Sequence, residues 1–326
     1  MENFDFSDIR RAAQRLQGHI VRTPLLSSPM LDAAAGCNLF VKAESLQRTG
    51  AFKFRGALNK LLTLTEDERA QGILAFSSGN HGHAVAAAAH HVGCTAVIVL
   101  PKGAAKIKVE NCRWWGAEIV FFDPETENRE AVGRRVAEER GGLTVVPPFD
   151  DYAIIAGQGT CGIEICEQMQ ERNIRPDAVL INSSGGGLSS GVTAAVKAIC
   201  PEADCYIVEP VGFEKMARSL EIGSPQANPS VPKSIMDAIT GPIAGTRTFS
   251  VLRQHAVKPL SVSDEEALVA MEAAFRMLKL VVEPGGAASL AAVLHRKADF
   301  AGKNVVVVCS GGNVDPEVFV RAITRA

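Results

Sequence analysis

Short apolar runs rich in β-branched residues recur along the chain, and most of them are apolar at every position. The clearest runs cover residues 39–42, 73–76, 96–100, 118–122, 179–181, 206–208 and 305–308. A strand that is apolar on both faces needs helices on both sides of its sheet, as in parallel α/β sheets. Helical patterns follow at about 81–91, 105–115, 126–139, 154–172, 190–199, 264–279, 286–297 and 316–324. The sequence therefore predicts an α/β, doubly wound fold.

Composition excludes several classes of protein. The 326 residues include 34 Lys+Arg and 36 Asp+Glu, and 47% are hydrophobic, so the chain is nearly neutral and can form a core. This composition does not fit a disordered or a polycationic protein. The lack of a basic run argues against nucleic acid as a partner. The length predicts two domains or one large α/β unit.

The location of the protein can also be predicted. The N-terminal segment MENFDFSDIR is acidic, and no window approaches the roughly 18 uninterrupted apolar residues of a membrane span. Eight cysteines are scattered without a C-x-x-C pair, which predicts reduced and mostly buried thiols. We expect a cytoplasmic protein without a membrane partner.

Two stretches rich in turn-forming residues interrupt the strand–helix pattern. The segment PPFDD at 147–151 separates two strand–helix sets, so we place a domain boundary near residue 147. The segment 223–248 is rich in Pro, Gly and Ser and is predicted to be a long loop near a site, because structureless connections of that length are usually functional.

Lys53 is the first candidate for chemistry. It lies between Phe52 and Phe54, an environment that disfavours the charged amine and lowers its pKa. A desolvated lysine is suited to act as a Schiff-base amine or as a base for proton transfer. The alternative is a lysine that extends to solvent from the start of an amphipathic helix.

Four glycine-containing turns stand out, and three of them follow predicted strands. The segment SSGNHG at 77–82 joins a strand to a helix start, where anions bind, although a serine cap explains part of it. The segment SSGGGLS at 183–189 would let successive N–H groups face a phosphate, and a flexible turn is the alternative. The segments EPGG at 283–286 and CSGGN at 309–313 complete the set, and Ser310 ends a strong strand.

Two other patterns are interpreted as structural. Gly157, Gly159 and Gly162 match G-x-G-x-x-G, but no clean strand precedes them, so we predict close helix packing rather than a dinucleotide site. His81 and the nearby histidines 83, 90 and 91 match no familiar spacing of metal ligands.

The five motifs TGAFKFRG (containing Lys53), SSGNHG, SGGGL, EPGGA and SGGNVD, in this order, resemble those of the fold-type II pyridoxal-phosphate enzymes. Within that class the chain is most similar to the serine/threonine dehydratases and serine racemases, over about residues 5–320. The resemblance implies pyridoxal 5′-phosphate as cofactor, two open, twisted, mostly parallel sheets flanked by helices, and a homodimer. It also implies a large cofactor-binding domain (1–68 and 147–326) and a small domain (69–146) that closes over the active site.

Site residues follow from the same resemblance. Lys53 would hold the cofactor and move the Cα proton, Asn80 would contact the pyridine hydroxyl, and Ser310 would face the pyridine nitrogen. The cofactor-binding set is Phe52, Lys53, Asn80, Ser184, Gly185, Gly186, Gly187, Leu188, Glu283 and Ser310, and the substrate-binding set is Ser77, Ser78, Gly79, Asn80 and His81.

The implied reaction is dehydration of L-threonine or L-serine to a 2-oxo acid and ammonia. Ser78 matches the residue that serves as acid and base on the face opposite the lysine in racemases. Racemisation and the elimination of D-serine or 3-hydroxyaspartate therefore stay open. An oxidoreductase using the 157–162 pattern and a non-catalytic cofactor-binding protein are the alternatives from other classes.

Four positions bear on how far the resemblance extends. Ala51 stands where relatives commonly have serine, and Ser184 where the phosphate loop often begins with glycine. Glu209 fits a strand-end ligand of magnesium- or calcium-binding relatives, whereas Lys215 occupies the place of their aspartate. A divalent cation at Glu209 is therefore left open.

Overall fold

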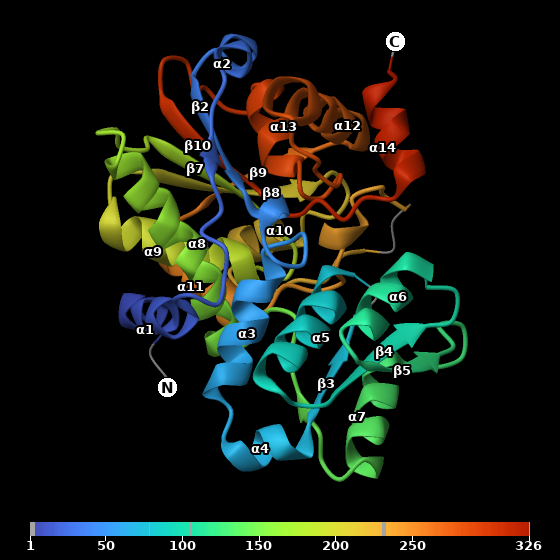
Figure 1. Ribbon diagram of the computed structural model, residues 1–326. Coiled ribbons are helices and arrows are strands. Elements are labelled where there is room, and N and C mark those ends of the chain that lie inside the picture. Colours follow the sequence, from blue (N-terminus) through green and yellow to red (C-terminus); the bar gives the residue numbers. More distant parts are fainter. Residues whose placement is uncertain (1–3, 78, 105, 230–232, 326) are drawn as a thin grey trace.

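The strands form two sheets in the computed structural model, which describes residues 4–77, 79–104, 106–229 and 233–325 (Figure 1). The larger sheet has the order β1 (Leu25–Leu26), β2 (Asn38–Ala43), β10 (Asn304–Cys309), β7 (Ala178–Asn182), β8 (Asp204–Pro210) and β9 (Lys258–Val262). The smaller sheet has the order β5 (Glu118–Phe122), β4 (Ala96–Pro101), β3 (Ile73–Phe76) and β6 (Thr144–Val145). Within the described ranges only β1 and β2 pair antiparallel, which confirms the predicted mostly parallel α/β class.

Helices cover both faces of each sheet, as the doubly apolar strands require. One face of the larger sheet carries α2 (Pro29–Ala35), α12 (Asp264–Ala273), α13 (Ala288–Leu294) and α14 (Pro316–Ile323), and the other carries α8 (Tyr152–Gln170), α9 (Gly187–Ile199), α10 (Lys215–Ile222) and α11 (Thr246–Gln254). On the smaller sheet, α5 (Asn80–Val92) and α6 (Lys106–Trp114) lie opposite α7 (Arg129–Glu139). The remaining α-helices are α1 (Phe6–Leu16), α3 (Lys53–Thr63) and α4 (Glu66–Gln71).

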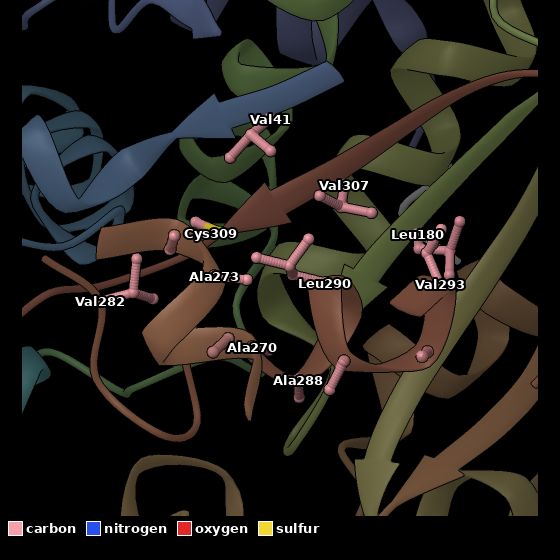
Figure 2. Close-up of a cluster of buried hydrophobic side chains, with 14 of the residues drawn as sticks. Val41, Leu180, Ala270, Ala273, Val282, Ala288, Leu290, Val293, Val307 and Cys309 are labelled. Carbon is pink, nitrogen blue, oxygen red and sulfur yellow. The ribbon is translucent and has the colours of Figure 1, made fainter. Parts of the chain in front are cut away.

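The core of the larger sheet shows why these strands are apolar throughout. Along β7, Leu180 faces α13 and Ile181 faces the α8–α9 layer, so alternate residues are buried in different clusters. Figure 2 shows Leu180 together with Val307 of β10 beside Leu290 of α13, and all three side chains are fully buried. Each such aliphatic side chain contributes roughly 1.5–3 kcal/mol by burial.

Helix α3 joins the core of the smaller sheet to the helices of the larger one. Its residues Phe54, Leu58 and Leu61 share one hydrophobic cluster with Ile73 of β3 and with α5. The same helix also packs along α8 beneath the larger sheet. The smaller sheet lies entirely between residues 73 and 145, and the division into 1–68 and 147–326 against 69–146 stays a prediction.

The G-x-G-x-x-G pattern lies inside α8 and not in a turn directly after a strand, in line with the predicted packing role. A Cβ atom on Gly157 would lie 2.7 Å from the backbone oxygen of Arg55, and one on Gly162 would lie 2.8 Å from the Cβ atom of Ala195. These glycines let α3 and α9 approach α8 closely. This position gives no support to the oxidoreductase alternative.

Two segments differ from the prediction. The expected loop 223–248 ends in the first turn of α11, which begins at Thr246. Helix α10, just before this loop, was not predicted, and the carboxylate of Glu209 on β8 accepts hydrogen bonds from N–H groups in its first turn. The short strands β1, β6 and β9 were not predicted because they are brief or partly exposed. All eight cysteines are free thiols, and six are buried. Within the described ranges, no helix has the length and apolar character needed to cross a membrane.

Candidate active site

A cavity of about 440 Å³ lies where the carboxyl ends of β3, β7 and β10 face one another. Its size is in the range typical of small-molecule sites. It brings together residues from all five motifs: Phe52, Lys53, Ser77, Gly79, Asn80, His81, Ser184, Gly185, Gly186, Gly187, Leu188, Glu283 and Ser310 all line it. Ser78 lies outside the described residues, so its role stays a prediction.

Lys53 is the first residue of α3, and its side chain forms part of the cavity lining. Its Nζ atom donates a hydrogen bond to the backbone oxygen of Pro148 at 2.7 Å and lies 5.2 Å from the centre of the Phe52 ring. Burial lowers the pKa of Lys53 to about 8. About a tenth of the amine is therefore neutral at pH 7, several hundred times more than in an exposed lysine.

A buried ion network fixes the start of α3. The Arg55 guanidinium donates to both oxygens of Glu44 and to both oxygens of Glu164, at 2.7–2.8 Å. Lys42 of β2 donates to Glu164 at 2.6 Å, so two cations balance two carboxylates. Removing one member would leave an unpaired buried charge and cost about 3–5 kcal/mol. The network holds α3 against β2 and α8, which sets the position of Lys53.

The glycine loop before α9 is rigid rather than flexible. A Cβ atom on Gly185 would lie 2.3 Å from the Phe149 ring. Gly186 has a φ of +95°, and a Cβ atom there would lie 2.7 Å from Oγ1 of Thr248. Thr248 in turn donates to the backbone oxygen of Gly185 at 2.6 Å. Only glycine fits these positions, and the loop presents backbone N–H groups and the N-terminus of α9 to the cavity, as an anion site requires.

Polar contacts across the cavity join the two sheets. Asn80, the first residue of α5, donates to Glu283 at 2.6 Å and accepts from Nδ2 of Asn313 at 2.7 Å. Burial raises the pKa of Glu283 to about 8, so this carboxyl is protonated at neutral pH. Burial also lowers the pKa of His81 to about 3, and the neutral ring bonds the Val146 carbonyl at 2.9 Å.

Asn182 is the last residue of β7, and Ser310 directly follows the neighbouring strand β10. The Ser310 hydroxyl accepts a hydrogen bond from Nδ2 of Asn182 at 3.0 Å. The same amide group donates to the carbonyl of Gly286 at 2.8 Å, which holds the glycine segment after Glu283 in place. Asn182 directly precedes the quoted segment 183–189, and sequence reasoning did not identify its function as a support for Ser310.

Two cations from the smaller unit, by which we mean the smaller sheet with α5, α6 and α7, line the cavity and were missed in the sequence. Lys108 on α6 lies 3.4 Å from Asp237, which belongs to the other side of the cavity. Arg129 on α7 lies with its guanidinium 5.4 Å from the centre of the Phe76 ring. Both helices have the mixed charge pattern of a solvated surface, so no local signal distinguishes these residues. They place two positive charges in the cavity lining, which also contains Asp237 and Asp315.

Glu209 does not lie in a metal centre. Its two carboxylate oxygens accept hydrogen bonds from the backbone N–H groups of Met216 at 3.1 Å and Ala217 at 2.9 Å. Lys215 places its Nζ atom 3.7 Å from Oε1 of Glu209. Across the described residues, no group of three or more His, Cys, Asp or Glu side chains could hold a metal ion. The residues present therefore do not fit a divalent cation.

Comparisons with known proteins agree with this site. A family model described as "Pyridoxal-phosphate dependent enzyme" matches residues 16–311. An L-threo-3-hydroxyaspartate ammonia-lyase of a Pseudomonas species is 40% identical over 319 residues, which cover 98% of each chain. Among solved structures, maize serine racemase has a TM-score of 0.90 at 37% identity and covers 98% of this chain and 96% of its own. A threonine deaminase from T.th. has a TM-score of 0.90 at 41% identity and covers 95% of this chain and 99% of its own.

Proposed function

Because this chain belongs to the family of pyridoxal-phosphate-dependent enzymes, we propose that it is an ammonia-lyase that eliminates the hydroxyl group of a 3-hydroxy amino acid. The observation that carries the proposal is the partly buried Lys53, whose amine has a lowered pKa and lines a cavity together with a closely packed glycine loop. A lysine of lowered pKa beside an anion-binding loop fits an aldehyde cofactor that carries a phosphate.

The residues fit pyridoxal phosphate group by group. Lys53 would carry the aldehyde carbon, and the N–H groups of the loop 185–187 would hold the phosphate. Asn80 and Ser310 supply polar atoms for the ring, and Ser310 is an uncharged partner held by Asn182. When bound, the cofactor provides an electron sink for the negative charge that develops at the substrate Cα atom.

The side chains then have separable tasks. Lys53 accepts the Cα proton, which its low pKa permits near neutral pH. Ser77 and the N-terminus of α5 receive the substrate carboxylate, because this helix start offers N–H groups to the cavity. His81 stays neutral and bonded to the Val146 carbonyl, so it supports the loop without adding charge.

The positive charges of Arg129 and Lys108 favour an acidic substrate. Lys108 and Arg129 line the cavity, and a second carboxylate on the substrate Cβ atom would find charge-assisted partners there. The similarity to an L-threo-3-hydroxyaspartate ammonia-lyase points the same way. We therefore place 3-hydroxyaspartate ahead of L-threonine and L-serine, which the sequence favoured.

L-threonine or L-serine dehydration is the second candidate. Phe76 and Ile239 line the cavity with apolar surface, which suits the methyl group of threonine. Serine racemisation depends on Ser78 and stays a prediction, although maize serine racemase has a similar structure.

A substrate panel tests these proposals. Ammonia and 2-oxo acid would be measured with L-threo-3-hydroxyaspartate, L-threonine, L-serine and D-serine, and chiral chromatography would follow serine. Arg129→Met and Lys108→Met should lower kcat/KM for 3-hydroxyaspartate about 10- to 100-fold and change that for L-serine by less than about threefold. Lys102→Met, at an exposed lysine of the same unit, is the matched control. Equal losses on both substrates would refute the acidic specificity, and a protein that stays colourless with added pyridoxal phosphate would refute the enzyme class.

A further inference from the structure

A buried ammonium group lies at the start of α10, away from the reacting groups. The side chain of Lys215 is fully buried. Its Nζ atom forms no hydrogen bond with any residue of the described ranges, and its charge faces Glu209 at 3.7 Å. A buried cation without hydrogen-bond partners is unfavourable unless a nearby opposite charge compensates for its lost hydration, so the position of Lys215 needs an explanation.

Glu209 joins this ammonium to the glycine loop. Its carboxylate binds the first free N–H groups of α10, and a negative charge is favourable at a helix N-terminus. The next residue of that helix, Met216, is fully buried against the loop: a Cβ atom on Gly186 would lie 2.9 Å from its Cε atom. The position of α10 therefore supports the glycine loop from behind.

A divalent cation has no room in this arrangement. Glu209 offers a single carboxylate whose two oxygens are already bonded, and the Lys215 ammonium would repel a second cation. Position 215 is also the one where the metal-binding relatives considered above have an aspartate. The charge that a metal would supply is already present on the chain.

We propose that the Lys215 ammonium is a built-in cation that takes the place of a divalent ion, holds Glu209 in position and so keeps α10 against the glycine loop. Folding and cofactor retention are then independent of divalent cations. This inference rests on the proposed function only in assigning the loop to the cofactor, and the stability measurements below do not depend on it.

The first test uses the wild-type protein. Its Tm, with and without cofactor, and its affinity for pyridoxal phosphate from absorbance titration should be the same in excess EDTA, Mg²⁺ or Ca²⁺. An increase in Tm of more than about 2 °C with either ion, or a loss of affinity in EDTA, would overturn the proposal.

The second test converts the pair into a metal-type site. In Lys215→Asp two carboxylates face each other, so its Tm should fall in EDTA and recover by several degrees with Mg²⁺ or Ca²⁺. Lys106→Asp makes the same charge change at an exposed position and should respond to neither ion. A Lys215→Asp protein indifferent to both ions would show that Lys215 does not stand in the place of a cation.

A third test, with two further variants, keeps the proposal testable if Lys215→Asp fails to fold. The double change Lys215→Met with Glu209→Gln removes both buried charges, whereas Lys215→Met alone leaves Glu209 unpaired. The single variant should have the lower Tm and the weaker cofactor affinity. The reverse order would contradict the proposal. If cofactor affinity is absent in the wild type while these Tm differences hold, the proposed function fails and the structural inference stands.

Discussion

Burial alone lowers the pKa of Lys53, and this has a direct kinetic consequence. Only a neutral amine attacks an aldehyde, so the rate at which apoprotein takes up pyridoxal phosphate should rise with pH to about 8 and then level off. An ordinary lysine, with a pKa of about 10.4, would continue to gain rate well above that. Absorbance in the near violet would follow the uptake. A rate that keeps rising above about pH 9 would contradict the shifted pKa.

Two variants on α3 complete that measurement. Lys53→Ala should form no covalent near-violet band and lose elimination activity by at least about 10³-fold. Lys60→Ala, on the same helix but paired with Asp151, should load cofactor at the wild-type rate. Loss of the band in both variants would mean that any change in α3 prevents cofactor loading, and the band would then not identify the Lys53 amine as the point of attachment.

Glu283 predicts how stability changes with pH. Burial raises its pKa from about 4.5 to about 8, so between these values the folded protein binds a proton that the unfolded chain releases. The stability contributed by this proton is complete at low pH and is lost as pH rises through 8, by at most about 1.4 kcal/mol per pH unit. Glu283→Gln lacks that loss, so its Tm relative to wild type should increase from about pH 5 to pH 8. Glu110→Gln, at a surface position, should show no such trend.

Which site residues could be found from the sequence depended on their local surroundings. Lys53, Asn80, Ser310 and the glycines at 185–187 lie in or beside turns of the quoted motifs, and parallel strands end at one edge, so their meeting could be predicted. Lys108 and Arg129 come from helices of ordinary surface composition. Their place in the cavity depends on how the two sheets face each other, which no local pattern contains.

The crossing of α3 and α8 makes two of the three glycines of the dinucleotide-like pattern, Gly157 and Gly159, unequal. Gly157→Ala would put a Cβ atom 2.7 Å from backbone atoms of Arg55 and Gly56, whereas Gly159→Ala would meet only the Ile9 side chain. We expect the first to lower the free energy of unfolding by about 1–3 kcal/mol or more and the second by less, since alanine also favours a helix. Urea denaturation of both variants measures this. Equal costs would show that the close approach of α3 is not what requires glycine.

Among the elements, strands buried on both faces were the most predictable. β3, β4, β7 and β10 are apolar along almost their full length, and that pattern alone implies helices on each side. β9 has exposed residues and no such pattern, and the start of α10 is bonded by a distant side chain, Glu209 of β8. Elements held by distant partners have no local signal.

The two sheets should unfold together. Residues of α3 lie in the core of the smaller sheet while the helix packs on α8 under the larger one. Trp114 and Trp115 are the only tryptophans and both lie beside the smaller sheet, whereas the cofactor would report on the larger. Urea transitions followed by tryptophan fluorescence and by cofactor absorbance should therefore coincide. A lower midpoint for fluorescence would mean that the smaller unit unfolds alone.

The oligomeric state and the cellular location of the whole molecule are also expectations. The homodimer and the cytoplasmic location come from the resemblance and from the sequence, and both stay predictions. Sedimentation at several protein concentrations tests the dimer, and a single species at the monomer mass would contradict it.

The shared helix α3 also determines what can move. Near its first residue the helix is bonded through Arg55 to Glu44, just after β2, and to Glu164 of α8, while farther along Leu58 and Leu61 lie in the core of the smaller sheet. If the smaller unit rotates over the cavity, the far end of α3 must travel with it, and the tied end acts as the pivot. Lys53 lies at that pivot. The reactive amine would keep its place relative to the glycine loop while the walls around the substrate close.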